Sequence, residues 1–249
     1  MKYVGRFMRK AVPYGAALLA TTLVVSANAQ TQQGEAKVYG LKGSADYSDG
    51  GGTWMPLRVG KVLRAGSLVR TAAESEVNLY LKQNGPTVRV TENTTMGLDK
   101  LLFEMTGADI VIETRLDLQK GRIQGKVNKT SDASKYEVKT PRLVAGIRGT
   151  EYDITADGMV VVKSGSVSVA FIRPDGTQLN FTVNAKQTFD PTIPGVRGAT
   201  ELELGDIKIP PYVGERFMIV FEPGKEPYVS PISGKDAPSG GSSPSGTSN

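Results

Sequence analysis

The chain has 249 residues, 30 of them Lys or Arg and 25 Asp or Glu, and it contains neither cysteine nor histidine. The missing cysteine excludes disulfide bonds and a cysteine nucleophile. The missing histidine excludes a Ser-His-Asp triad and a zinc site of the usual kind. A domain of this size must therefore be stabilised by a hydrophobic core, and about 200 residues are enough to form one.

Residues 1–29 have the pattern of an export signal. Four basic residues and no acidic one lie among the first ten, an apolar run follows, and Ala-Asn-Ala at 27–29 forms a small-x-small cleavage site. The alternative is an uncleaved membrane anchor, although the apolar run is short and Pro13 interrupts it. We expect cleavage, a mature chain without a transmembrane helix, and a location in the periplasm or outside the cell.

The net charge of the mature chain argues against nucleic acid as a partner. Four of the 30 basic residues and none of the 25 acidic ones lie in the predicted signal, which leaves 26 against 25, a net charge of +1. Nucleic-acid binding needs a concentrated basic surface. We therefore predict no nucleic-acid partner.

The chain after the signal predicts strand after strand. Residues 30–35 are polar and are expected to be a loose N-terminus, and residues 36–43 to form the first strand. Residues 45–53 are rich in Gly, Asp and Ser and predict a turn. A calcium loop is the alternative for this segment, but the ligand spacing of an EF-hand is absent. Residues 91–104 predict either a strand or a short irregular crossing.

Trp54 is the only tryptophan in the chain. A single tryptophan is more often a core residue, so we expect Trp54 to be buried. The alternative is an exposed platform on which a sugar ring could stack.

A locally basic stretch covers residues 126–148. We interpret it as a solvated sheet face and loop; a surface for an acidic partner is the alternative. The basic residues are Lys126, Lys129, Lys135, Lys139, Arg142 and Arg148.

Residues 140–154, TPRLVAGIRGTEYDI, carry the highest density of local signals. Pro141 pushes Thr140 to an extended conformation. Gly146 and Gly149 bracket Arg148, and glycine within a strand pattern usually marks a bulge or a close backbone approach. The stretch therefore predicts a strand, a kink and a second strand.

The last third of the chain predicts further strands and a disordered end. Asp175-Gly176 is a strong hairpin signal between two strand-like segments. Residues 201–210 predict another strand, on which Glu201 and Glu203 would share one face. Such a pair could supply an acid and a base, but neighbouring surface glutamates are far commoner. Residues 229–249 are rich in Gly, Ser and Pro and are expected to be disordered.

The pattern as a whole predicts an all-β domain, a sandwich or a barrel-like fold, because strands are short and turns closely spaced. We divide the chain into a signal at 1–29, a β domain at 36–190, a C-terminal β extension at 191–228 and a tail at 229–249.

Four spaced blocks resemble the FecR family over about residues 38–190. They are GTWMPLRVGKVLRAGSLVRT at 52–71, LQKGRIQGKV at 118–127, VKTPRLVAGIRGTEYDI at 138–154 and VKSGSVSV at 162–169. The residues that carry this signature, for which we expect structural roles, are Trp54, Thr140, Pro141, Gly146, Arg148, Gly149 and Thr150.

The resemblance implies an exported, non-catalytic β module related to double-stranded β-helix or sandwich architectures, without cofactor or metal. The best-known members of the family regulate iron-uptake transcription through a cytoplasmic anti-sigma segment, one membrane helix and a periplasmic domain that receives a signal from an outer-membrane transporter. Only about ten residues precede the apolar run here, too few to hold a sigma factor. We therefore expect a stand-alone exported domain.

Arg148 would lie between apolar strands, and a buried arginine must be paired. We predict that it ties two strands together through Glu137, Glu151 or Asp153. Direct recognition of a partner is the alternative for this residue.

Three functions remain open from the sequence. The first is a binding or scaffold module of the cell envelope with a protein or an envelope polymer as ligand. The second is the signalling component of a FecR-type sigma-factor system for iron uptake. The third is a carboxylate-dependent enzyme acting on glycans, for which we expect no turnover.

Overall fold

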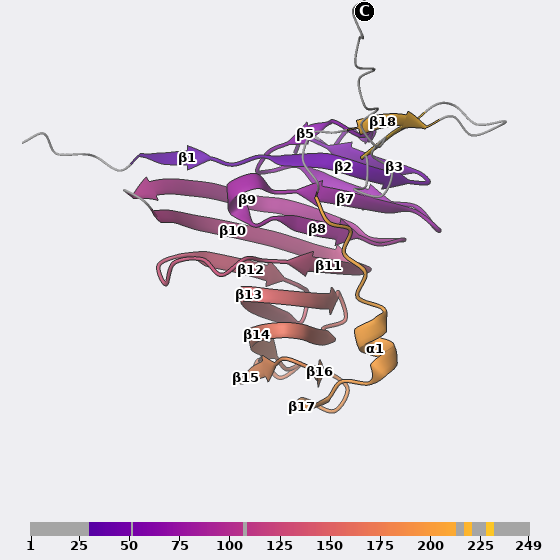
Figure 1. Cartoon of the computed structure of the whole chain (residues 1–249). Helices are drawn as coiled ribbons and strands as arrows, with labels where there is room; N and C mark the ends of the chain where they lie inside the picture. The colour runs from indigo at the N-terminus through magenta and orange to yellow at the C-terminus, as the bar shows by residue number, and fades with distance from the viewer. Residues whose placement is uncertain (1–29, 51, 107–108, 213–216, 221–227, 232–249) are drawn as a thin grey trace, which may run out of the picture.

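The computed structural model describes residues 30–50, 52–106, 109–212, 217–220 and 228–231 (Figure 1). The predicted export signal and almost all of the predicted tail lie outside these residues. Within them no helix is long and apolar enough to cross a membrane.

The predicted all-β class is confirmed, because nearly every element is a strand. The strands are β1 (Thr31–Gln33), β2 (Ala36–Lys42), β3 (Ala45–Ser48), β4 (Met55–Pro56), β5 (Val62–Leu63), β6 (Leu68–Thr71), β7 (Glu76–Tyr80), β8 (Thr87–Val90), β9 (Thr95–Thr106), β10 (Asp109–Lys120), β11 (Arg122–Lys126), β12 (Lys135–Lys139), β13 (Leu143–Thr155), β14 (Val160–Ile172), β15 (Gln178–Asn184), β16 (Gln187–Asp190), β17 (Gly195–Gly198), β18 (Phe217–Val220) and β19 (Tyr228–Pro231). A 3-10 turn, η1 (Lys82–Asn84), and one short helix, α1 (Glu201–Gly205), complete the elements.

Strands β1 to β17 belong to one network of pairings that closes on itself, and β18 and β19 pair separately. Two long strands connect its two halves. The first part of β13 pairs with β12 and its second part with β11, while β14 pairs with β15 near its end and with β16 near its start. One row of strands therefore runs β2-β7-β8-β11 and the other β9-β10-β12, and both rows continue through β13 and β14.

Alternating side chains from the two rows fill a single hydrophobic core. In β10, for example, Ile112, Leu116 and Leu118 are buried, while Arg115 between Ile112 and Leu116 and Gln119 after Leu118 are exposed. This period of two follows from the pleat of a strand, which turns successive side chains to opposite faces. The core also contains polar contacts, such as that between the buried hydroxyl groups of Tyr136 in β12 and Tyr152 in β13, which lie 3.2 Å apart.

Several local predictions are confirmed. Of the two alternatives for the segment at 91–104, the structure shows the strand, since most of it belongs to β9. Asp175-Gly176 closes the β14–β15 hairpin, in which the Gly176 amide donates to the carbonyl of Arg173 at 2.9 Å.

Other local predictions are wrong. Residues 31–33 are not loose, because β1 pairs with β9. The predicted turn at 45–53 begins as strand β3, which pairs with β6. Residues 201–205 form a helix and not a strand. Within the segment predicted as a C-terminal β extension, β17 pairs with β16 and so continues the sheet beyond residue 190.

Candidate binding surface

The predicted kink in β13 is a β-bulge facing a second irregularity in β14. The register with β14 shifts between Arg148 and Glu151, where Gly149 has a φ of 60° and Gly165 opposite it a φ of 83°. A Cβ added to Gly165 would lie 2.3 Å from the carbonyl oxygen of Gly149. Thr150 closes the bulge, since its buried hydroxyl donates to the carbonyl of Ser166 at 2.8 Å. Gly149, Gly165 and Thr150 thus allow the backbones of β13 and β14 to approach each other closely at the bulge.

Thr140 and Pro141 form the tight connection that enters β13. The Thr140 hydroxyl is buried and accepts from the amide of Leu143 at 3.1 Å, and the Thr140 amide donates to the carbonyl of Leu143 at 2.8 Å. Pro141 is exposed at the corner of this turn. The pair sets the direction in which the strand leaves the turn.

Arg148 does not make the predicted tie between strands. Its side chain is exposed and forms an ion pair with Asp132, whose own side chain is 90% exposed. The acids predicted as its partners bind other residues: Glu137 binds Arg115, Glu151 binds Lys126, and Asp153 binds Arg122. The reason is the pleat, which turns Ile147 into the core and Arg148 to the outer face.

The buried ion pair of the fold is Arg122 with Asp153, which the sequence did not single out. Asp153 is 2% exposed and accepts from the Arg122 guanidinium at 2.6 to 2.8 Å and from the Gln124 amide at 2.8 Å. The hydrogen bond to Asp153 raises the pKa of Arg122 against the opposing effect of burial. Both residues lie inside the blocks that resemble the FecR family, and Asp153 was predicted there only as a possible partner of Arg148.

A strap covers this pair. We use that name for residues 206–212, which run from α1 past β11, β8 and β7 (Figure 1). Gln124 donates to the carbonyl of Asp206 at 2.7 Å, and Tyr39 donates to the carbonyl of Pro210 at 2.7 Å. At its end the ring of Tyr212 stacks on Tyr80 with centroids 3.8 Å apart. The strap thus makes a second buried layer on a face that the sequence pattern predicts as solvated.

Trp54 is half-buried and lies outside the core, so the prediction of a core residue is wrong. The Arg70 guanidinium lies 4.2 Å from its ring centroid, and Arg70 in turn binds Asp46 at 2.8 Å. One face of the indole is therefore covered by a cation and is not open to a sugar ring on that side.

Glu201 and Glu203 do not form a catalytic pair on a strand. Glu203 accepts from the backbone amide of Thr200 at 2.7 Å, caps α1, and binds Arg197 at 2.6 Å. The hydrogen bond from Arg197, followed by those from Thr200, lowers the pKa of Glu203 from 4.5 to about 2. Its carboxyl is ionised at neutral pH and engaged in structure.

The basic stretch at 126–148 lies largely on exposed strand positions and turns. Lys126 and Arg148 are in ion pairs, and Arg142 lies over the Phe171 ring at 5.5 Å. The arrangement agrees with a solvated sheet face.

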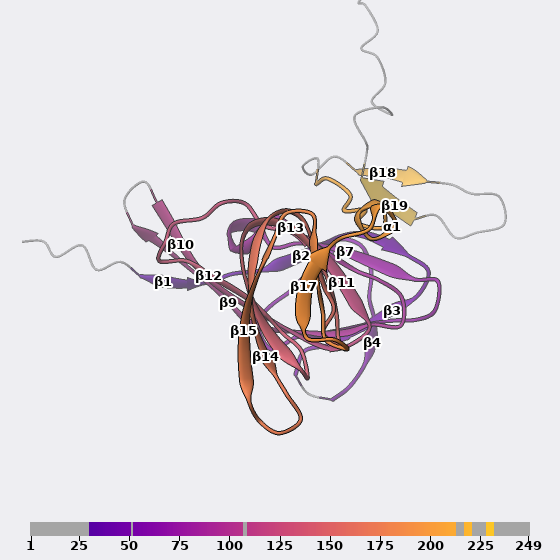
Figure 2. The same cartoon turned by 90° about the horizontal axis from the view of Figure 1, so that it is seen from below.

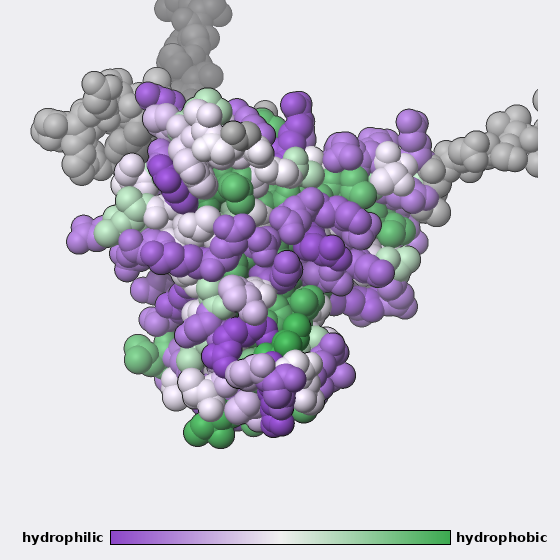
Figure 3. All heavy atoms as spheres, turned by 180° about the vertical axis from the view of Figure 1, so that it is seen from behind, coloured by the Kyte–Doolittle hydropathy of each residue, from purple (hydrophilic) through white to green (hydrophobic). Residues whose placement is uncertain are grey.

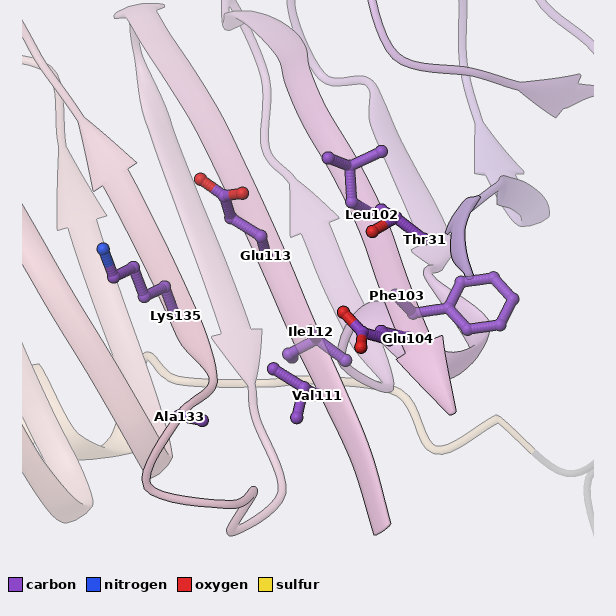
Figure 4. A pocket seen from close by; sticks show the side chains of 9 residues that line it. All are labelled: Thr31, Leu102, Phe103, Glu104, Val111, Ile112, Glu113, Ala133 and Lys135. Carbon is purple, nitrogen blue, oxygen red and sulfur yellow. The ribbon is translucent and has the colours of Figure 1, made fainter. Parts of the chain in front are cut away.

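Two adjoining hollows lie on the outer face of β9, β10, β12, β13 and β14, and we call them together the trough. The first encloses about 200 Å³, and Leu102, Glu113 and Lys135 project from its floor in the same direction (Figure 4). Lys135 also borders the second hollow, of about 330 Å³. The second is lined by Ser134, Lys135, Tyr136, Glu137, Gly146, Ile147, Arg148, Ser166 and Ser168.

The trough exists because small residues face outward in its centre. Gly146, Ser166 and Ser168 are neighbours across β13 and β14, and a Cβ on Gly146 would meet nothing closer than 3.8 Å. Charges of both signs lie along the sides: Lys100 binds Glu113 at 2.8 Å and thereby lowers its pKa, and Arg115 binds Glu137 at 3.0 Å. Hydrophilic side chains cover most of the face seen in Figure 3, with small hydrophobic patches among them. Such a surface can take an extended ligand by hydrogen bonds and ion pairs.

The described residues hold no group of three or more acidic side chains that could bind a metal ion. The two aspartates of the segment at 45–53 that had suggested a calcium loop are engaged separately. Asp46 binds Arg70, and Asp49 accepts from the Ser67 hydroxyl at 2.9 Å.

Comparison with known proteins gives one family. Residues 67–168 match the family described as FecR protein, a range that includes the bulge, the Arg122–Asp153 pair and much of the trough. The comparison with curated proteins gave no match. Among solved structures, the chain is similar to a proposed anti-sigma factor from Parabacteroides distasonis, with 12% identity and a TM-score of 0.41. That similarity covers 55% of this chain and 62% of the other, and a score of this size does not establish a shared fold.

Proposed function

Because this chain is a FecR-domain protein, we propose that it is an exported, non-catalytic binding module of the cell envelope whose ligand, a protein or an envelope polymer, lies along the trough. The observation that carries the proposal is the position of the trough. Its second hollow is lined by Gly146 and Arg148, two residues of the stretch that most resembles the family.

The binding mode follows from the lining. Ser166 and Ser168 offer hydroxyl groups on exposed strand positions, and Gly146, opposite Ser168, leaves the sheet surface low beside them. Glu137 pairs with Gly146, so Lys135 and Arg148, two residues away along their strands, lie toward one end of the hollow and Glu137 toward the other. Alternating donors, acceptors and charges of both signs suit an extended ligand that carries both kinds of group, such as a polypeptide segment.

Arg148 is the residue of the trough most available to a ligand. Its ion pair with Asp132 joins two exposed side chains, and such pairs contribute only about 0 to 1 kcal/mol. A ligand carboxylate can therefore replace Asp132 at small cost. In this proposal Arg148 recognises a partner, which was the alternative to its predicted role as a strand tie.

The non-catalytic part of the proposal rests on the residue types present. The chain has no histidine or cysteine, and Glu203 is engaged by Arg197 and Thr200. A turnover screen of the purified protein on cell-wall and polysaccharide substrates tests this part. We expect no product.

A second function, signalling within a FecR-type sigma-factor system, is favoured by the family match. In that case the anti-sigma part would be supplied by a separate chain, and the trough would receive the signal of an envelope partner. Genes for a sigma factor and an outer-membrane transporter beside the gene of this protein would favour this function. Their absence would leave the binding module as the better proposal.

The trough can be tested by filling it. We expect Ser168→Trp to abolish retention of the ligand when the purified protein is used to capture partners from envelope extract, because an indole at this position occupies the second hollow. Gln119→Trp is the matched control: it also adds an indole at an exposed strand position, on β10 but outside both hollows.

Both variants should keep the circular dichroism spectrum and melting temperature of the parent, since both positions are exposed. Equal capture by the parent and by Ser168→Trp would refute the trough as the binding site. If the parent retains neither protein nor glycan, the binding function itself is refuted.

A further inference from the structure

Strand β15 lies at an edge of the sheet. It pairs with β14 along seven residues, from Gln178 to Asn184, and no other described strand pairs with it. Seen from below, β15 lies at the surface of the molecule beside β17 (Figure 2). An edge strand exposes backbone groups that can pair with another chain.

The hydrogen bonds of β14 show which groups of β15 point outward. The Ser166 amide and carbonyl both bond the Thr150 hydroxyl, and the Ile172 amide bonds the carbonyl of Arg142, so even-numbered residues of β14 face β13. Its odd-numbered residues therefore face β15. By the cross-strand register, the odd-numbered residues of β15 bond β14 and its even-numbered residues face away from the sheet.

Gln178, Asn180 and Thr182 thus direct their backbone N–H and C=O groups to the open side. The same parity holds for Asn184, whose amide already donates to the Gln187 side chain at 2.8 Å. The open part of the edge is therefore the five-residue segment 178–182, which lies next to the hairpin turn.

This edge lacks the features that usually prevent pairing. Natural edge strands carry charges, prolines or bulges that block a second strand. The sequence of β15, QLNFTVN, has no charge, proline or glycine, and its pairing with β14 has no register shift. Edge strand β17, by contrast, has four residues and carries Arg197.

We propose that β15 pairs with β15 of a second copy of this chain, antiparallel and with the two-fold axis at Asn180. Each copy then places Asn180 opposite Asn180, Gln178 opposite Thr182, and Leu179 opposite Phe181. Polar side chains meet polar ones on the outer face, half-buried apolar ones meet on the inner face, and no like charges oppose each other. A surface that is complementary to itself in this way fits a two-fold dimer.

Formation of the dimer does not require the ligand proposed above, but it would affect how that ligand binds. The two-fold axis of an antiparallel strand pair is perpendicular to the sheet, so the outer faces of both copies point the same way. The two troughs would then lie on one continuous sheet surface, and a polymer or a repetitive partner could engage both.

A single cysteine tests the register, because the chain has none of its own. In the proposed dimer Asn180 forms a hydrogen-bonded pair with itself, for which the Cα separation is about 5.5 Å, within the range of a disulfide. We expect Asn180→Cys to form a disulfide-linked dimer under mild oxidation. The matched control is Asn184→Cys, also exposed on the outer face of β15, whose copies would lie roughly 27 Å apart.

Sedimentation of the unmodified full chain tests the association itself. We expect a concentration-dependent dimer, its loss in Asn180→Lys, and its return when Asn180→Lys is mixed with Asn180→Asp, since opposite charges then face each other. A monomer at all concentrations, or equal crosslinking of Asn180→Cys and Asn184→Cys, would overturn the proposal. Neither result depends on Ser168→Trp, so failure of the dimer and failure of the trough are distinguishable.

Discussion

Two ion pairs lie on either side of the β13 bulge, one made by Arg148 of β13 and the other by Arg122 of the neighbouring strand β11, and they differ in burial. Arg148, just before the bulge, pairs with Asp132 at the surface, and the side chains are 45% and 90% exposed. Arg122 pairs across the strands with Asp153, after the bulge, and these side chains are 35% and 3% exposed. Asp153 also accepts from Gln124, whereas Asp132 lies in an exposed turn.

The difference teaches that the density of sequence signals does not locate the buried charge. Arg148 lies in the stretch with the strongest family pattern, yet the side chain of its partner Asp132 is 90% exposed. Asp153 is buried beside the strap, about fifty residues later in the sequence, and Gln124 bonds both the Asp153 carboxylate and the carbonyl of Asp206 in the strap. A buried carboxylate depends on its partner far more than an exposed one.

The largest effect is expected from Arg122→Ala. The substitution leaves the Asp153 carboxylate buried without its cation, which typically costs about 3 to 5 kcal/mol of unfolding free energy. Urea denaturation followed by circular dichroism measures it. The double variant Arg122→Ala with Asp153→Ala should recover part of the loss, because no unpaired buried charge remains; an unchanged midpoint for the single variant would contradict a structural role for the pair.

Gly165→Ala tests whether the stability of the region around the β13–β14 bulge depends on backbone geometry and not on the side chain of Arg148. The φ of 83° is strained for alanine, and the added Cβ would lie 2.3 Å from the Gly149 carbonyl oxygen. We expect a loss of roughly 1 to 3 kcal/mol in the same denaturation experiment. Gly146→Ala is the control, because its Cβ has 3.8 Å of room; equal losses for both would mean that the bulge is not the constraint.

Glu203→Gln weakens the helix from which the strap begins, with an effect that depends on pH. The pKa of Glu203 is lowered to about 2 by Arg197, so its contribution is complete above about pH 4.5 and is lost as the pH falls toward 2. We expect the variant to be less stable than the parent by about 1 kcal/mol at pH 7. Thermal melts between pH 7 and 2 should show the two curves converging; a constant difference would exclude the ionised carboxylate as the cause.

The smallest effect is expected from Arg148→Ala. An exposed ion pair is worth about 0 to 1 kcal/mol, so the melting temperature should hardly change. The same variant should weaken ligand retention if Arg148 recognises a partner. A large loss of stability would restore Arg148 to the role of a strand tie and remove the contrast with Arg122.

Much of the local structure could be predicted from the sequence, because it depends on neighbours in the chain. Alternation in β7 and β10, the Asp175-Gly176 hairpin and the kink between Gly146 and Gly149 follow from the pleat and from glycine's freedom at positive φ. The helix at Glu201 was missed although its capping box can be recognised from Thr200 and Glu203, three residues apart. The apolar alternation of ELEL favoured a strand instead.

The candidate site was less predictable, since it is made of strands far apart in the sequence. Gly146 and Arg148 were recognised as notable, but the hollow beside them also needs Ser166, Ser168 and Lys135. Serines on an exposed face carry no signal of their own. Trp54 was placed in the core on its apolar character, and the structure instead leaves it half-buried under Arg70.

By itself the sequence determined the class of the protein: missing cysteine and histidine exclude whole classes of chemistry, and period-two alternation with spaced glycines leads to an all-β domain, of which residues 67–168 match the FecR family. Only the tertiary structure decided which polar face is buried and which is open. The pleat divides a strand into two faces, but whether the polar one meets water depends on segments that arrive from elsewhere in the chain. The strap covers Asp153, and no described segment pairs with the edge of β15.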